Sequence, residues 1–163
     1  MKVGILSDSH DHLTALGRAV EIFNDEKIEF VIHAGDFVAP FSLRALEELR
    51  CPWIGVFGNN DGEQQGLTQQ SKGRIQLGPY HLSLDGKKVV VVHDLTDSMR
   101  AEIIHSGARI VISGHTHKPT IERAGEVLFI NPGELCGWIS GRRTVALLDS
   151  TSLEVSLIEV ALE

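Results

Sequence analysis

The sequence predicts an α/β fold in which two mixed β-sheets pack together and α-helices flank them. Three observations support this prediction. Strand-like and helix-like patterns alternate in the first part of the chain, a rhythm typical of parallel strands covered by helices. Later segments form apolar pairs joined by short turns, which indicates antiparallel hairpins. The composition is 42% apolar but only 6% aromatic, which suits an interior rich in Val, Ile and Leu.

The first part of the chain supplies three predicted strands and two predicted helices. Residues 2–6 (KVGIL) are a short apolar strand, and residues 12–25 carry apolar side chains at near-helical spacing. Residues 30–35 form a second buried strand. Residues 40–49 open with a proline and predict a second helix, because proline is favoured in the first helical turn. Residues 53–58 form the third strand.

The second part of the chain is richer in hairpins. Residues 80–94 predict two strands around an Asp-Gly turn, and residues 98–107 a short helix that ends at a glycine. Residues 108–114 form another buried strand. Residues 120–131 predict a second hairpin with an Ala-Gly turn, and residues 143–160 give two further strands. No linker divides the chain, so we expect one domain over residues 1–163.

Composition also narrows the possible partners and the cellular location of the protein. The net charge of −7, without a block of Lys or Arg, does not indicate a nucleic-acid partner. The amino-terminal apolar run is too short for a signal peptide or a membrane span. Cys51 and Cys136 lie far apart and form no CxxC pattern. We therefore expect free thiols in a cytoplasmic protein, neither metal ligands nor a disulfide. The sequence leaves open whether the chain forms a homo-oligomer.

Polar residues gather at the ends of the predicted strands. In open α/β sheets, ligands bind outside the carboxyl ends of the strands, so five such loops predict one shared site. The clustered residues are Asp8, His10, Asp36, Asn59, Asn60, Asp61, His93, His115 and His117.

Each cluster taken alone also has an ordinary explanation. The stretch from Asp8 to His10 precedes a predicted helix, which Ser9 or Asp11 could cap. Asp36 follows a glycine and reads equally well as a turn residue. His93, at the end of four valines, and the weaker histidines His12, His33, His81 and His105 read as core, surface or boundary residues.

The combination indicates a metal site. His115 and His117 are alternate residues of an extended segment, so their rings point the same way. Carboxylate, amide and imidazole ligands without thiolates suit Mn, Fe, Ni, Co or Zn. Two Asp, one Asn and four His give seven possible ligands. Seven are too many for one four-coordinate zinc site, but they suit two metals that share a carboxylate.

The order Asp-x-His, Gly-Asp, Gly-Asn-x-Asp, His, Gly-His-x-His, spread over residues 8–117, resembles the motif series of the calcineurin-like metallophosphoesterase superfamily. The opening GILSDSHDH and the later INPGE are similar to its short bacterial and archaeal phosphodiesterase branch. The resemblance implies a four-layer sandwich and a metal-dependent phosphoesterase, specifically a phosphodiesterase, acting on a small-molecule phosphoester. A phosphomonoesterase and a catalytically decayed scaffold are the alternatives.

The resemblance also implies a ligand set and a nucleophile. The first metal would be held by Asp8, His10 and His117, the second by Asn59, His93 and His115, and Asp36 would bridge them. Two divalent ions are implied, with Mn expected and Ni, Fe, Co or Zn as alternatives. A water or hydroxide between the metals would attack phosphorus.

Two positions depart from the pattern of the family. Many relatives have His at the position of Asn60, the expected catalytic residue that contacts the phosphate. Asn can donate a hydrogen bond there but cannot act as a general acid near neutral pH. Many relatives have Gly where this chain has Asp94, and Asp97, which lies close by, could instead begin the next helix. Asp61 reads either as a support behind the ligands or as a plain turn residue.

Overall fold

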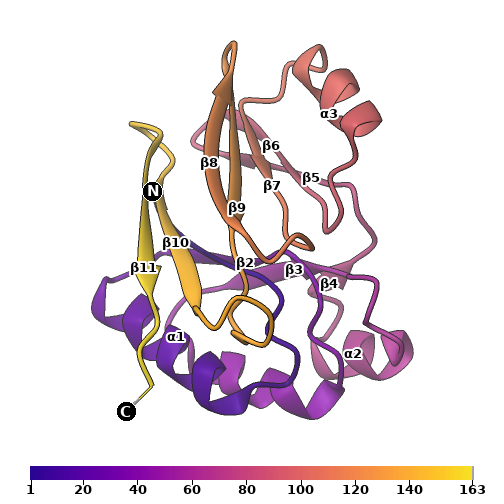
Figure 1. The fold of residues 1–163 in the computed structure, drawn as a ribbon, viewed down its shortest axis with the longest axis vertical. Helices are drawn as coiled ribbons and strands as arrows, with labels where there is room; N and C mark the ends of the chain where they lie inside the picture. Colours follow the sequence, from indigo (N-terminus) through magenta and orange to yellow (C-terminus); the bar gives the residue numbers. More distant parts are fainter. Residues whose placement is uncertain (163) are drawn as a thin grey trace.

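The computed structural model describes residues 1–162 as two mixed β-sheets stacked face to face, with helices on the outside (Figure 1). This confirms the predicted fold class. The expected hairpins and the alternation of strand and helix are all present.

The first sheet has the strand order β11-β10-β1-β2-β3-β4. Strands β1 to β4 run parallel, whereas β10 pairs antiparallel with β1 and β11 antiparallel with β10. The strands span Lys2–Leu6 (β1), Phe30–His33 (β2), Trp53–Val56 (β3), Ile75–Gln76 (β4), Thr144–Asp149 (β10) and Glu154–Glu159 (β11).

The second sheet has the order β5-β6-β7-β9-β8, with β6, β7 and β9 parallel and a hairpin partner at each edge. Its strands span Tyr80–Leu84 (β5), Lys87–Val91 (β6), Ile110–Ile112 (β7), Pro119–Ala124 (β8) and Val127–Pro132 (β9).

The helical segments are α1 (Leu13–Asp25), η1 (Pro40–Glu48), α2 (Gln64–Gln70) and α3 (Asp97–Ile104). The segment at residues 40–49, predicted as an ordinary helix, is a 3-10 helix. Its buried Leu43 and Leu46 are three residues apart, which matches three residues per turn. The sequence reading missed α2 because Leu67 is its only buried residue, so it shows no apolar periodicity.

Neither of the two residues that could have capped α1 does so. His12, not Ser9 or Asp11, stands at the N-cap, and its Nδ1 accepts from the Ala15 amide at 3.3 Å. The carboxylate of Asp11 instead accepts from the Ala39 amide at 3.0 Å, because the chain turns toward the neighbouring β2–η1 loop. The contact joins two loops that are far apart in the sequence.

The core has one layer between the sheets and one layer under the helices on each side. Val3 and Ile5 of β1 face the second sheet, whereas Leu6 packs with α1. Phe23 of α1 lies so close to β1 that a Cβ on Gly4 would stand 2.8 Å from its ring. Burial of such a side chain contributes about 1.5–3 kcal/mol. This packing fixes α1, and with it the loop between β1 and α1, against the sheet.

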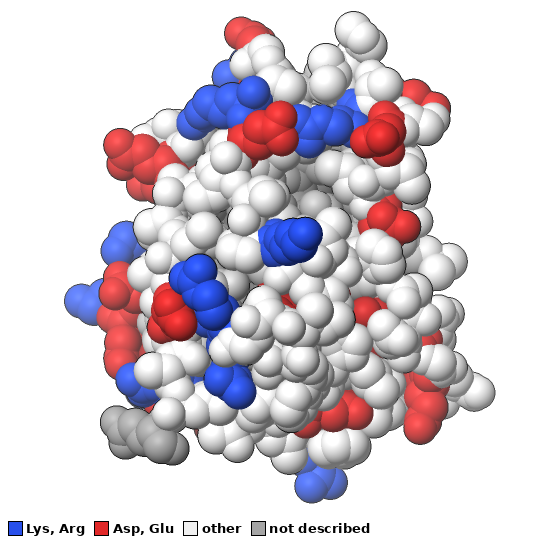
Figure 2. Space-filling model, viewed as in Figure 1, with Lys and Arg blue, Asp and Glu red and all other residues white. Residues whose placement is uncertain are grey.

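On the face shown in Figure 2, acidic and basic side chains are interspersed rather than gathered into one basic stripe. No helix within residues 1–162 has both the length and the apolar character to cross a membrane.

Candidate metal centre

The loops after β1, β2, β3, β6 and β7 meet at one place. The Asp8 amide donates to the Gly35 carbonyl at 2.9 Å, which joins the first two loops. The two sheets are joined where the His115 amide donates to Asp8 Oδ2 at 3.1 Å. The convergence brings together the whole predicted ligand set: Asp8, His10, Asp36, Asn59, His93, His115 and His117.

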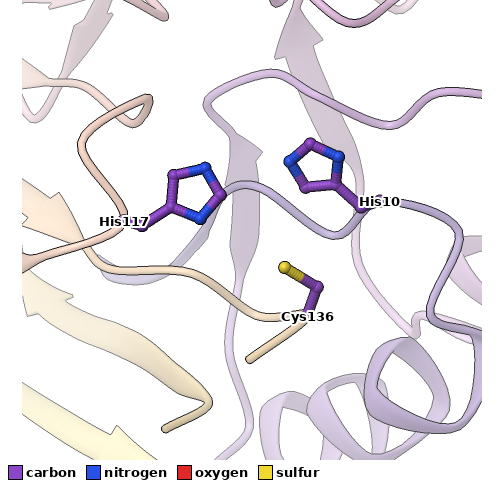
Figure 3. A group of neighbouring side chains, drawn as sticks. All are labelled: His10, His117 and Cys136. Carbon is purple, nitrogen blue, oxygen red and sulfur yellow. The ribbon is translucent and has the colours of Figure 1, made fainter. Parts of the chain in front are cut away.

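Asp8, His10 and His117 form one half of the centre. Asp8 Oδ1 lies 3.5 Å from His117 Nε2 and 4.0 Å from His10 Nε2. The two imidazole rings have centroids 5.5 Å apart and planes that differ by 28°, and they lie side by side in Figure 3. Asp8 is fully buried, and burial raises the pKa of its carboxyl. This half therefore combines one buried carboxylate with two partly buried imidazoles.

Asn59, His93 and His115 form the other half. Asn59 Oδ1 lies 2.9 Å from both His93 Nε2 and His115 Nδ1. His93 is buried, whereas Asn59 and His115 are exposed. This half therefore opens to solvent and offers a path for a substrate.

Asp36 stands between the two halves. Its Oδ2 lies 3.4 Å from His10 Nε2 on one side and 3.4 Å from His93 Nε2 on the other. Burial acts to raise the pKa of Asp36, but hydrogen bonds from His93 and Asn60 outweigh it and hold the pKa below the ordinary range. The group is thus an ionised carboxylate at neutral pH, placed where it can serve both halves.

The donor atoms need a cation. His93 Nδ1 lies 2.7 Å from the Ala34 carbonyl, which can only accept, so Nδ1 carries the proton. The other ring nitrogen, Nε2, faces the oxygens of Asn59 and Asp36, which also only accept. Burial acts to lower the pKa of His93, but the Asp36 carboxylate outweighs it and raises that pKa, so either a ring proton or a metal ion occupies the position between them. Asp8 Oδ1 and His10 Nε2 are buried and have no hydrogen-bond partner among the described residues. Converging acceptors and orphaned buried atoms fit a site for divalent metal ions.

The backbone at the centre is held in an uncommon conformation. Positive φ angles occur at Asp8 (52°), His10 (40°), Asp36 (61°), His115 (67°) and His117 (61°). Left-handed backbone costs about 1–3 kcal/mol at a residue other than glycine and clusters at functional sites. Five of the seven predicted ligands thus lie on backbone of this kind.

Asp61 organises the loops behind the ligands. Its side chain is buried and accepts from the amides of Gly58 (2.7 Å), Val38 (2.7 Å) and Asp36 (3.1 Å). Gly58 itself lies against the Asp36 backbone and carboxylate, so a side chain there would collide with them. Of the two readings left open for Asp61, the structure supports a role in holding the ligand loops in place.

Asn60 contacts the central carboxylate. Its backbone amide donates to Asp36 Oδ1 and its Nδ2 to Asp36 Oδ2, both at 2.8 Å. The residue is also exposed, at the open side of the centre. Asn60 is therefore placed to position Asp36, and its expected contact with the phosphate stays a prediction.

Glu134 supports the predicted ligand His117, and the sequence analysis did not single it out. It is fully buried, and its Oε2 accepts from His117 Nδ1 at 2.9 Å. The carboxylate also accepts from the backbone amides of Ile139 and Ser140. Burial acts to raise the pKa of Glu134, but these hydrogen bonds outweigh it and lower the pKa to about 2. The only signal in the sequence was the glutamate in INPGE.

Glu134→Gln is expected to weaken metal binding about 10- to 100-fold, the usual effect of removing a hydrogen-bonded carboxylate behind a ligating histidine. The glutamine keeps the shape but loses the charge that fixes the proton on His117 Nδ1. The measurement is a titration of metal-free protein with Mn²⁺. Glu126→Gln, on an exposed turn, is the control, and equal affinities for the two variants would refute the role.

Cys136 lies at the centre although it belongs to none of the clusters at the ends of the predicted strands. Its sulfur lies beside the rings of His10 and His117 (Figure 3). The reason is a long-range contact: the Cys136 amide donates to the Asp8 carbonyl at 3.0 Å, which brings its loop to the centre. Its Sγ donates to Glu134 Oε2 at 3.1 Å. Both Cys51 and Cys136 are free thiols in the structure.

We still expect neither cysteine to be a ligand. Burial, together with the neighbouring Glu134 carboxylate, raises the pKa of the Cys136 thiol to about 12, so its proton is hard to remove. The double variant Cys51→Ser, Cys136→Ser should keep its metal content and kcat nearly unchanged, because serine can still donate to Glu134. Loss of bound metal, measured by elemental analysis, would show that Cys136 is a ligand.

The remaining sequence candidates lie outside the centre or at its edge. His33 is fully buried, stacks on Phe37 with centroids 3.7 Å apart, and bonds Ser9 Oγ at 2.9 Å, in line with a packing role. His12 and His105 flank helices rather than lie within them. Asp97 begins α3, and Asp94 Oδ2 lies 3.9 Å from His115 Nε2.

Known proteins resemble this chain along most of its length. Residues 1–152 match the model described as the calcineurin-like phosphoesterase superfamily domain. Phosphodiesterase MJ0936 from Methanocaldococcus jannaschii is 41% identical over 168 aligned positions that cover 100% of both chains. A solved structure described as a novel archaeal phosphodiesterase has a TM-score of 0.91 at 39% identity and covers 98% of this chain and 99% of that one. Phosphodiesterase YfcE from Escherichia coli K12 is 24% identical, over 83% of this chain and 79% of its own.

Proposed function

Because the chain belongs to the calcineurin-like phosphoesterase superfamily, a family of hydrolases that act on phosphoric esters, we propose that it hydrolyses phosphodiesters at a dinuclear metal centre. The observation that carries this proposal is the position of Asp36, at 3.4 Å from a histidine of each half. Asp8, His10 and His117 would hold the first ion, and Asn59, His93 and His115 the second.

When bound, the ions would polarise the phosphoryl oxygens and lower the pKa of a shared water, which acts as the nucleophile. The chain contributes position and charge. His93 and His117 are each fixed by a hydrogen bond at Nδ1, so Nε2 is presented to the centre. Mn is the proposed metal, with Ni, Fe, Co or Zn as alternatives, because this donor set suits all of them.

The charge of the ligand set favours an anionic substrate. Two divalent ions carry about +4, and Asp8, Asp36 and a hydroxide return about −3. Asn59 contributes a neutral oxygen, so a positive surplus of about one charge remains. An aspartate at position 59 would cancel it.

Asp94 favours a diester over a monoester. Its carboxylate lies at the exposed edge of the centre, near His115, and adds negative charge there. A phosphodiester carries one negative charge, whereas a monoester carries nearly two at neutral pH. A small-molecule phosphodiester is therefore the proposed substrate, and phosphomonoester hydrolysis at the same site is the alternative.

A decayed scaffold would lack some of the ligands, and here the whole set converges. We also propose a cytoplasmic location, which the free thiols support.

The proposal is tested with purified protein. Metal content is measured first, and then hydrolysis of bis(p-nitrophenyl) phosphate is followed in metal-free protein after addition of Mn²⁺ or Ni²⁺. We expect two ions per chain when metal is in excess, and activity that depends on them. A protein that binds one ion, or that binds two and hydrolyses no diester or monoester, would overturn the proposal.

A further inference from the structure

A stacked pair of aromatic rings lies beside the first half of the centre. The ring centroids of His12 and Trp138 are 4.8 Å apart and their planes differ by 19°. His12 follows His10 by two residues, and Trp138 follows Cys136 by two residues. The sulfur of Cys136 in turn lies beside His10 (Figure 3). Both rings therefore stand on the segments that meet at this half.

Trp138 is exposed although its loop is firmly held. Its exposed fraction is 63%, against 4% for Trp53, and that of Ile139 is 74%. The amides of Ile139 and Ser140 donate to the buried carboxylate of Glu134, which also holds His117. One carboxylate thus fixes both a predicted metal ligand and the loop that presents Trp138. A large apolar ring held rigidly in solvent at this place suits a ligand contact better than a role in folding.

Arg143 adds a positive charge beside the stacked rings of His12 and Trp138, a place called here the aromatic corner. A Cβ on Gly137 would stand 2.9 Å from Arg143 Cγ and 3.3 Å from Cζ, so the guanidinium lies against the loop. Gly137 directly precedes Trp138 in the sequence, so this charge lies beside the loop that presents the ring. No carboxylate of residues 1–162 forms an ion pair with Arg143. The corner offers flat rings and an uncompensated cation, which suit an aromatic group attached to an anion.

We propose that His12, Trp138 and Arg143 form a subsite for an aromatic ring of the substrate. This ring belongs to the retained arm, which is the ester substituent that stays bonded to phosphorus when the other one leaves. The inference rests on the proposed function. Asn60, the residue expected near the phosphate and its departing group, belongs to the loop after β3 that carries the second-metal ligand Asn59. The aromatic corner lies at the first half, and it therefore suits the other arm. The enzyme would prefer aryl or nucleoside phosphodiesters over alkyl ones.

Two diesters that share one leaving group and differ in the retained substituent isolate the effect of an aromatic ring on that substituent. The substrates are phenyl p-nitrophenyl phosphate and methyl p-nitrophenyl phosphate, and the quantity is the ratio of their kcat/KM values. Stacking on one aromatic side chain is expected to be worth about 10-fold. Trp138→Leu, which keeps an apolar side chain without the ring, should lower the phenyl-to-methyl ratio about 10-fold, mainly through KM. Trp138→Phe should retain most of the ratio.

Leu157→Ala is the control, because Leu157 is a partly exposed apolar residue on β11, an edge strand of the first sheet. Its ratio should equal that of the wild type. An unchanged ratio in Trp138→Leu would overturn the subsite, including the case in which both substrates slow equally. Thymidine 5′-(p-nitrophenyl phosphate) then distinguishes a nucleobase from a simple aryl group, by its ratio to the methyl ester.

A binding measurement separates this inference from the proposed function. In Trp53→Phe, Trp138 is the sole tryptophan, and its fluorescence reports on the corner directly. Diphenyl phosphate should quench it in a saturable way with metal-loaded protein, and dimethyl phosphate should not. Equal responses to the two anions would refute the aromatic subsite. A wild-type protein that hydrolyses neither substrate would refute the proposed function, while the quenching would still decide the subsite.

Discussion

Replacement of Asp36 by alanine is expected to remove essentially all hydrolysis. Asp36 Oδ2 lies 3.4 Å from a histidine of each half, so its loss affects both metal positions at once. Metal ions stabilise a phosphoryl transition state by several kcal/mol, and several kcal/mol correspond to about 10³-fold in rate. Asp36→Asn should lose nearly as much, because the neutral amide keeps the shape but removes the negative charge between the ions.

The measurement is kcat with metal in excess, together with the number of ions bound per chain. Both variants should also bind less metal, because each half loses a shared ligand. Asp25→Asn, which removes one charge at the exposed end of α1, is the control and should behave as the wild type. If Asp36→Ala kept more than a few per cent of wild-type kcat, the two-metal assignment would be wrong.

The second large effect concerns the departing group. Asn60 cannot donate a proton near neutral pH, and general acid catalysis is typically worth about 10²–10⁴-fold for a poor leaving group. The wild-type enzyme should therefore hydrolyse aryl esters much faster than simple alkyl esters. In a series of diesters that differ only in the leaving group, a plot of log kcat/KM against leaving-group pKa should show a steep negative slope.

Asn60→His should flatten that slope by raising the rates of esters with poor leaving groups. The structure adds a cost: the variant loses the side-chain hydrogen bond from Asn60 Nδ2 to Asp36 Oδ2. Asn60→Ala carries the same loss without gaining an acid, so it should slow all substrates alike and keep the steep slope. A shallow slope in the wild type, with chemistry shown to be rate-limiting, would mean that another group or a water supplies the proton.

The sequence alone determined the fold class, and together with the family resemblance it predicted the ligand set. Buried strands and the polar residues that end them are local patterns, and the carboxyl ends of parallel strands meet at one edge of a sheet. Asp8, Asp36 and Asn59 follow β1, β2 and β3 in this way. Local pattern therefore sufficed to predict that these residues converge, as the structure now shows.

The tertiary structure alone decided which residues support the ligands. Glu134 holds His117 across 17 positions of sequence, Asp61 bonds the Asp36 amide across 25, and Cys136 reaches the centre through the Asp8 carbonyl. The loop between β9 and β10, which carries Glu134, Cys136 and Trp138, has no strand or helix period to read. Its place is set by hydrogen bonds to segments far away in the chain. Such contacts depend on the packed arrangement of both sheets, which local sequence does not encode.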